Sequence, residues 1–255
     1  MKRWLCWSWV VLGCACGAET EGQSIAIHWT LGADDASAER EFVTDTGWQV
    51  SLDEARVGIA SVFAIAPSAD KPSAVARISG LFVSVAHAHG GHDDASGRRI
   101  RAELLDVIAL DVLADEPQRT AAESAEAGDI ETMKFELARA KDKLPAELHG
   151  KAAWVRGSAE RNGTRVSFEG GVSLADDEPA RRVETRVKLS LSEGGTLRVG
   201  VRPSEWFRSA EFDRLPEAAD DEPSQITPDD QVGRAWTIGL RSPAAFDVSW
   251  DRAKD

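Results

Sequence analysis

Short runs in which apolar and polar residues alternate recur along the chain, separated by turn-forming residues. Residues 25–31, 48–52, 55–66 and 78–89 show this period of two. Because successive side chains of a strand point to opposite faces, the pattern predicts strands with one buried face. Two further strands are predicted near the end of the chain, at 235–240 and 245–250.

Two pairs of neighbouring runs carry turn signals between them. The pair Asn162-Gly163 separates two alternating runs, and this dipeptide is the strongest short-range signal for a β-hairpin. Gly194-Gly195 interrupts residues 183–203 in the same way, with apolar residues at alternate positions from Val183 to Leu191. Two successive hairpins favour an antiparallel sheet.

Two segments fit more than one type of element. Residues 100–113 are compatible with one helix or with two short strands. In residues 129–140, Met133, Phe135 and Leu137 have strand spacing, whereas Ile130, Met133 and Leu137 have helix spacing. Periodicity alone does not decide between helix and strand in such short runs, so both alternatives stay open.

The number and spacing of the short strands indicate the fold class. The chain of 255 residues is long enough to bury a sizeable core, and its strands do not alternate regularly with helices. The sequence therefore predicts an all-β fold, an antiparallel β-sandwich of Greek-key or jelly-roll type with at most one or two short helices. We expect a single domain over residues 25–255.

The first residues have the organisation of a secretory signal. Lys2 and Arg3 precede an apolar run that is too short to span a bilayer as a helix. The tetrapeptide VLGC at 11–14 resembles the lipobox of bacterial lipoproteins. This resemblance implies a signal peptide at 1–13, cleavage before Cys14, acylation of Cys14, and a lipidated tether over residues 14–24. Ala15 follows in place of the aspartate that retains such proteins at the inner membrane, so we expect an outer-membrane anchor in the cell envelope, facing the periplasm or the exterior.

The net charge and the cysteine content limit the partners that the chain can bind and the disulfides that it can form. The net charge is −13, and loss of Lys2 and Arg3 with the signal peptide makes the remaining chain more acidic still. Such a charge argues against nucleic acid as a partner, and membrane contact is expected through the lipid anchor alone. Cys6 would be removed and Cys14 acylated, so that Cys16 has no partner for an internal disulfide.

A histidine cluster is the strongest candidate for function. His87, His89 and His92 account for three of the five histidines in the chain, and Asp93 and Asp94 follow directly. On a strand, residues 87 and 89 point to the same side, about 7 Å apart. The glycines at 90 and 91 allow a turn that could bring the third imidazole to the same point. These five residues are the predicted metal ligands, with the aspartates as direct ligands or as acceptors for the imidazole N–H groups.

Imidazole and carboxylate ligands suit Zn²⁺, with Cu²⁺ or Ni²⁺ as alternatives. We therefore expect a lipid-anchored protein that binds or delivers a divalent transition metal. A solvent-exposed polar loop is the alternative interpretation of the same residues. In that case the protein is a structural or interaction module of the envelope without metal, whose aromatic surface or acidic loops contact a protein partner.

Two resemblances bear on the histidine cluster. An apolar strand that runs into HAHGGH resembles the His-x-His-x-Asp-His motif of the metallo-β-lactamase superfamily, which implies a hydrolase. Gly91 replaces the family's aspartate, and only His149 remains downstream where the family needs further ligands. The overall plan is also loosely similar to small periplasmic metal-binding lipoproteins. No nucleophile elbow, phosphate loop or dinucleotide fingerprint is present, so the sequence leaves enzymatic activity open and favours a non-catalytic role.

Tryptophan is frequent in this chain, and tyrosine is absent. Most of the tryptophans are predicted to pack in the core or at sheet edges. Trp206 and Phe207 are expected to close the open end of the sandwich. His28 lies between apolar neighbours and is interpreted as a strand histidine, unless its strand adjoins the one that ends at His89.

Overall fold

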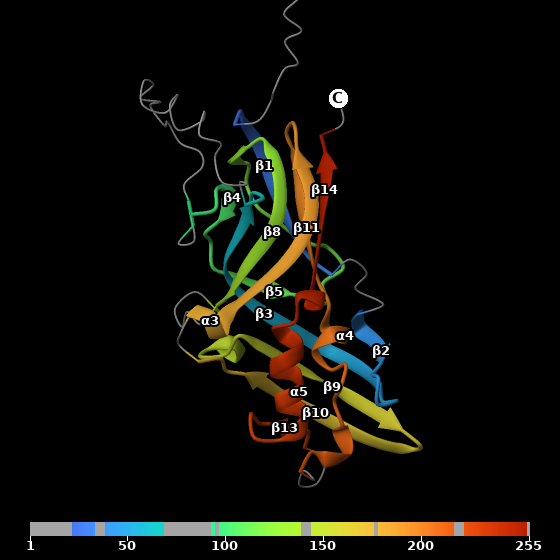
Figure 1. The fold of residues 1–255 in the computed structure, drawn as a ribbon. Helices are drawn as coiled ribbons and strands as arrows, with labels where there is room; N and C mark the ends of the chain where they lie inside the picture. The colour runs from blue at the N-terminus through green and yellow to red at the C-terminus, as the bar shows by residue number, and fades with distance from the viewer. Residues whose placement is uncertain are drawn as a thin grey trace, which may run out of the picture.

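The computed structural model describes residues 22–33, 39–68, 93–94, 97–138, 144–175, 178–216 and 222–253 (Figure 1). The signal peptide, the lipobox, the strand predicted at 78–89 and the histidines at 87, 89 and 92 lie outside these residues. None of the described helices is long and apolar enough to cross a bilayer.

The described strands form two sheets that pack as a sandwich, so the all-β prediction is confirmed (Figure 1). The five-stranded sheet contains β14 (Phe246–Arg252), β12 (Gly195–Val201), β1 (Ser24–Gly32), β6 (Gln118–Arg119) and β7 (Glu123–Glu126). The nine-stranded sheet follows the order β11 (Arg182–Leu191), β8 (Gly128–Leu137), β3 (Gln49–Ile65), β9 (Ala153–Arg161), β10 (Thr164–Val172) and β13 (Ser224–Ile226). The short strands β2 (Glu41–Val43), β4 (Ile100–Leu104) and β5 (Ile108–Asp111) also pair with β3. Each sheet includes one parallel pair, β1 with β12 and β10 with β13.

Strand β3 connects the two halves of the molecule. Its second half pairs with β8 and β4 and faces the five-stranded sheet. Its first half pairs with β9, in the part of the molecule where helix α5 (Gln231–Leu240) packs against β10 (Figure 1). Its alternating side chains place Val50 and Leu52 in the core, and Val57 is buried on the other side of a register shift between Leu52 and Glu54; all three are at most 1% exposed. Phe135 of β8 stacks on Phe246 of β14, with ring centroids 4.5 Å apart, and thereby joins the two sheets.

The Asn-Gly hairpin is confirmed. Strands β9 and β10 pair without interruption from Ala153 with Val172 to Arg161 with Thr164. Asn162 and Gly163 have φ values of 53° and 79°, the left-handed conformation that a tight hairpin turn requires. This pairing is set by residues that adjoin in sequence, which is why the local pattern was sufficient.

The hairpin predicted around Gly194-Gly195 is wrong. Both strands exist, but β11 pairs with β8, while β12 pairs with β1 and β14 in the other sheet. A Cβ on Gly195 would lie 2.4 Å from the carbonyl oxygen of Asp251 and 2.7 Å from the ring of Trp250. This glycine therefore permits close approach of β14, and the connection crosses from one sheet to the other.

The strand predicted at 235–240 is also wrong, because these residues belong to α5. The Asp230 side chain accepts a hydrogen bond from the backbone N–H of Gly233 at 2.6 Å and so caps the helix. Val232, Trp236 and Leu240 follow at intervals of four and are fully buried. The alternation within AWTIGL is a fragment of this helical period.

The two segments whose sequence was compatible with either a helix or a strand form strands. Residues 100–113 contain β4 and β5, and residues 129–137 contribute most of β8. The aromatic segment near residue 206 is buried as expected. It forms the single-turn helix α4 (Pro203–Trp206), in which Trp206 is fully buried and stacks on Trp236 of α5. Another single turn, α3 (Glu178–Arg181), precedes β11.

Candidate functional site

The connection between β3 and β4 carries the predicted metal ligands. His87, His89 and His92 lie outside the described residues, so their arrangement is not described. The two ends of the connection are described and lie side by side. The Ala66 N–H donates to the Arg99 carbonyl oxygen at 2.9 Å, and Asp93 forms a backbone bridge with Arg99. We call the connection between Ala66 and Arg99 the histidine segment. Its two ends lie at the same point of the sheet.

The two predicted aspartates have different surroundings. Both carboxylate oxygens of Asp94 accept hydrogen bonds from Arg98, at 2.9 Å from its backbone N–H and at 3.2 Å from Nε. Arg98 also lies 3.7 Å from Glu184 of β11, which ties this turn to the sheet. The Asp93 side chain is exposed. Asp94 thus shapes the turn, and Asp93 is the better placed of the two to contribute an oxygen ligand.

A buried ion cluster holds the base of this connection. Glu126 of β7, only 3% exposed, accepts hydrogen bonds from Arg101 Nη1 and Arg99 Nε, both at 2.7 Å. Arg101, 6% exposed, also donates to the carbonyl oxygens of Ala127 and Asp129. Because both charges are paired and hydrogen-bonded, their burial is compensated. The cluster joins β4 to β7 and fixes where the histidine segment returns to the fold.

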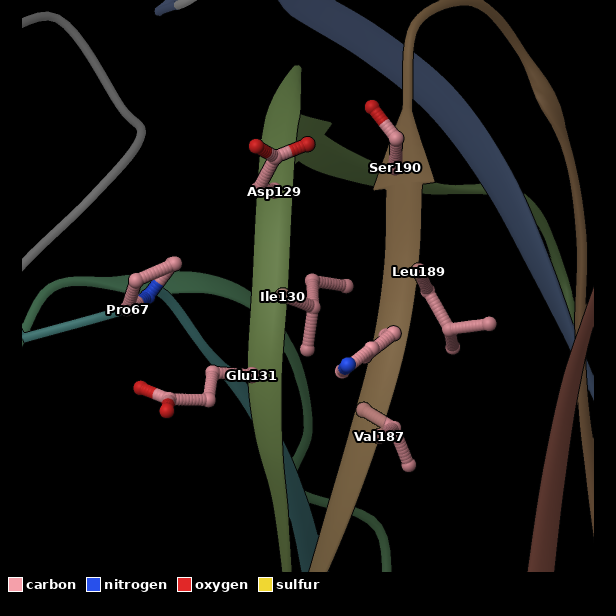
Figure 2. Close-up of a pocket in the computed structure, with 8 residues that line it drawn as sticks. Pro67, Asp129, Ile130, Glu131, Val187, Leu189 and Ser190 are labelled. Atoms are coloured by element: carbon pink, nitrogen blue, oxygen red, sulfur yellow. The ribbon is translucent and has the colours of Figure 1, made fainter.

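A groove of about 430 Å³ adjoins the other end of the connection, between β8 and β11 (Figure 2). It forms where Val187 and Lys188 lie opposite the single residue Glu131, since the register shifts between Arg186 and Leu189. Figure 2 shows Glu131 extending toward Pro67, close to the start of the histidine segment. The groove therefore offers the carboxylates of Asp129 and Glu131 and an apolar floor beside Pro67, where the connection leaves β3.

An acidic pocket of about 280 Å³ lies at the edge of the sandwich, lined by Glu103, Leu105, Asp106, Glu123 and Ser124. Trp29 Nε1 donates to the carboxylate of Glu123 at 3.0 Å. Burial raises the pKa of Glu123 above its ordinary value of 4.5. The Trp29 hydrogen bond opposes this rise, and the charges of Asp106 and Glu103 add to it.

This raised pKa predicts a pH effect that the variant Glu123→Gln should remove. The folded chain binds the proton more tightly than the unfolded chain, so acidification from neutral pH toward 4.5 relieves a destabilising charge. We expect the free energy of unfolding of Glu123→Gln minus that of the wild type to be larger at pH 7 than at pH 4.5, because only the wild type carries the destabilising charge at neutral pH. Urea unfolding at the two pH values measures this difference. The exposed Glu131→Gln is the control, and an identical pH dependence for Glu123→Gln and wild type would contradict the assignment.

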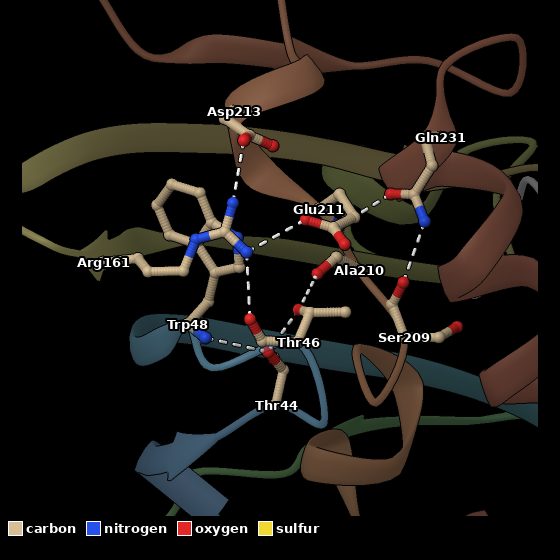
Figure 3. Close-up of polar contacts among 9 residues, drawn as sticks. All are labelled: Thr44, Thr46, Trp48, Arg161, Ser209, Ala210, Glu211, Asp213 and Gln231. Atoms are coloured by element: carbon tan, nitrogen blue, oxygen red, sulfur yellow. Dashed lines mark hydrogen bonds and ion pairs between the residues drawn. The ribbon is translucent and has the colours of Figure 1, made fainter.

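A cluster of polar contacts around Arg161 anchors the segment after α4 (Figure 3). The guanidinium of Arg161 lies over the Trp48 ring, 4.6 Å from its centroid, and donates to the Thr46 carbonyl oxygen and to the carboxylates of Glu211 and Asp213. Gln231 accepts from the Glu211 backbone N–H at 2.7 Å. These hydrogen bonds and ion pairs fasten the segment that contains Glu211 and Asp213 to the residues just before β3.

In the part of the chain that the structure describes, no three His, Cys, Asp or Glu side chains are grouped closely enough to hold a metal ion. The Arg101–Glu126 pair was missed by the sequence interpretation. In IRAEL, Arg101 and Glu103 both occupy the polar positions of an alternating run, so nothing local indicates that Arg101 is buried or that its partner lies 25 residues away.

No model of a known protein family matches the sequence, and no curated protein is similar to it. Among solved structures, the chain is similar to "MbnP from Methylosinus trichosporium", with 14% identity, a TM-score of 0.43, and coverage of 89% of this chain and 98% of that chain. The functional argument therefore depends on the residues of this chain.

Proposed function

We propose that this protein binds a divalent transition metal through His87, His89 and His92, with Asp93 assisting. The observation that carries the proposal is their spacing in the sequence: two histidines at alternate positions of a run predicted to be a strand, two glycines, and a third histidine. Neutral imidazoles with an added carboxylate favour Zn²⁺, and Cu²⁺ or Ni²⁺ fit the same donors.

The anchored ends of the segment support this proposal. Because Ala66 and Arg99 are hydrogen-bonded and Arg99 is held by Glu126, the ligands would be presented from a loop whose two ends are fixed. Fixing the two ends of the segment lowers the entropy cost of bringing the ligands together. The exposed side chain of Asp93 at this base is compatible with an oxygen ligand.

A set of three or four protein ligands on a surface loop favours an exchangeable ion, and hence binding or delivery of the metal. We further propose that acylation of Cys14 tethers the sandwich to the outer membrane, with the short stretch before β1 as the linker. This places the metal site at the membrane surface, where the acidic chain is held by its lipid.

Titration of Zn²⁺ into the full-length chain in non-ionic detergent, followed by calorimetry, tests the metal proposal. We expect stoichiometric binding at neutral pH that weakens as the pH falls through about 6.5, because neutral imidazole is the ligand form. The variant His87→Ala/His89→Ala/His92→Ala should lose this binding.

The matched control is His149→Ala, since His149 is exposed and its ring Nε2–H donates a hydrogen bond to the Leu144 carbonyl oxygen at 2.9 Å. Binding that survives the triple substitution would disprove the site. In that case the segment is a polar loop, and the role of the protein lies in a surface that contacts a partner.

A further inference from the structure

A polar pocket lies on the outer face of the five-stranded sheet, on the strands β12, β1 and β6. Ile27, Trp29 and Leu31 of β1 are fully buried, so the alternate residues His28 and Thr30 point to the opposite face. Thr30 pairs with Arg198 of β12 on one side and with Arg119 of β6 on the other. The two arginines therefore flank Thr30, with Cα atoms roughly 10 Å apart.

We call this the threonine–arginine pocket; it has a volume of about 300 Å³ and is lined by His28, Thr30, Arg119, Thr120, Thr196 and Arg198. All six side chains carry an N–H or O–H group, and none is acidic. A second hollow of about 260 Å³ shares Thr30 and Arg198 with it, which extends the cavity along the strand pair. The chain has a net charge of −13, so a pocket lined by hydrogen-bond donors without an acidic residue differs from the acidic character of the chain as a whole.

Several of these donors have no protein acceptor among the described residues. Arg119 forms no ion pair there, and the hydroxyl groups of Thr30 and Thr196 make no hydrogen bond. The Thr120 hydroxyl is used within the fold, since it accepts from the Trp29 N–H and donates to the Ala121 carbonyl oxygen. Arg198 contacts Asp251 through Nε, which leaves the Nη groups for a ligand.

We propose that the threonine–arginine pocket binds a phosphate group, either of inorganic phosphate or of a small phosphomonoester. Guanidinium groups bind phosphate oxygens through paired N–H donors, and two of them approach from opposite sides here. The hydroxyl of Thr30, between the two arginines, and that of Thr196 supply donors from the strands beneath. A tetrahedral anion has oxygens in each of these directions, whereas a planar carboxylate reaches fewer of them. Asp115 in the second hollow and Asp251 beside Arg198 repel negative charge on any part of a ligand beyond its phosphate group. The pocket therefore favours a small ligand with one phosphate group.

None of the proposed metal ligands belongs to this pocket, so the phosphate proposal does not depend on the metal site. Calorimetric titration of inorganic phosphate into the full-length chain, in chloride buffer of constant ionic strength, tests it. We expect saturable binding of one phosphate per chain. Arg119→Gln should weaken it roughly tenfold, the usual effect of losing a charge-assisted hydrogen bond. Thr30→Val should weaken it several-fold with unchanged thermal unfolding.

The matched control is Arg186→Gln, which removes an exposed arginine from β11 in the other sheet and should leave phosphate binding unchanged. sn-Glycerol 3-phosphate should compete with phosphate, and the competition should weaken in Arg119→Gln. The proposal is overturned if phosphate binding is not saturable, if Arg186→Gln reduces it as much as Arg119→Gln, or if acetate binds as tightly as phosphate.

Discussion

Replacing Arg101 with methionine is expected to lower the free energy of unfolding by about 3–5 kcal/mol, the usual cost of breaking a buried ion pair. Methionine preserves most of the apolar stem but leaves Glu126, 3% exposed, without the 2.7 Å hydrogen bond from Arg101. The carbonyl oxygens of Ala127 and Asp129 lose their donor as well. Urea unfolding followed by circular dichroism measures the loss.

Two further variants separate the buried pair from a general effect of removing charge. Arg252→Met removes an exposed arginine that lies 3.7 Å from Glu193, and it should cost at most about 0.5 kcal/mol. Adding Glu126→Met to Arg101→Met should recover part of the loss, because the buried carboxylate that Arg99 alone would then compensate is absent. If Arg101→Met costs no more than Arg252→Met, the ion cluster does not stabilise the fold as argued.

Replacing Trp236 with alanine is expected to cost a similar amount, about 3–5 kcal/mol, through loss of buried apolar surface and the cavity left behind. Trp236 is fully buried, and its ring lies 6.2 Å from that of Trp206 and 5.2 Å from that of Phe207. These contacts attach α5 to α4 and to Phe207 directly after it, and α5 in turn packs against β10. Urea unfolding is again the measurement.

The same helix supplies the control for Trp236. Ile238→Ala removes a side chain that is 73% exposed and should change the free energy of unfolding by no more than about 0.5 kcal/mol. Trp236→Phe should cost less than the alanine variant, because the indole N–H has no hydrogen-bond partner among the described residues. Equal losses for Trp236→Ala and Ile238→Ala would contradict the packing argument.

The helix α5 illustrates how a local pattern misleads when it is read in too short a window. AWTIGL alternates over six residues, but the buried positions Val232, Trp236 and Leu240 reveal the helical period only when the window begins at the Asp230 cap. The glycines at 194 and 195 mislead for another reason. A hairpin turn and a close approach between strands both require the absence of a Cβ, so the residue type alone does not distinguish them.

The two candidate sites also differ in whether the sequence alone reveals them. The histidine cluster is visible in the sequence because its members lie within six positions, and its chemistry follows from their type and spacing. The threonine–arginine pocket is invisible there. Its members come from residues 28–30, 119–120 and 196–198, and only the register of three strands brings them together.

The sequence by itself determined which segments become strands at most positions, which faces those strands bury, and where the Asn162-Gly163 hairpin turns, because these properties depend on neighbours along the chain. Only the tertiary structure decided that β11 and β12 separate into different sheets, that β1 lies parallel to β12, and that Glu126 meets Arg101. These pairings join residues far apart in the sequence. Their free energy comes from burial and charge compensation that exist only once the two sheets have packed together.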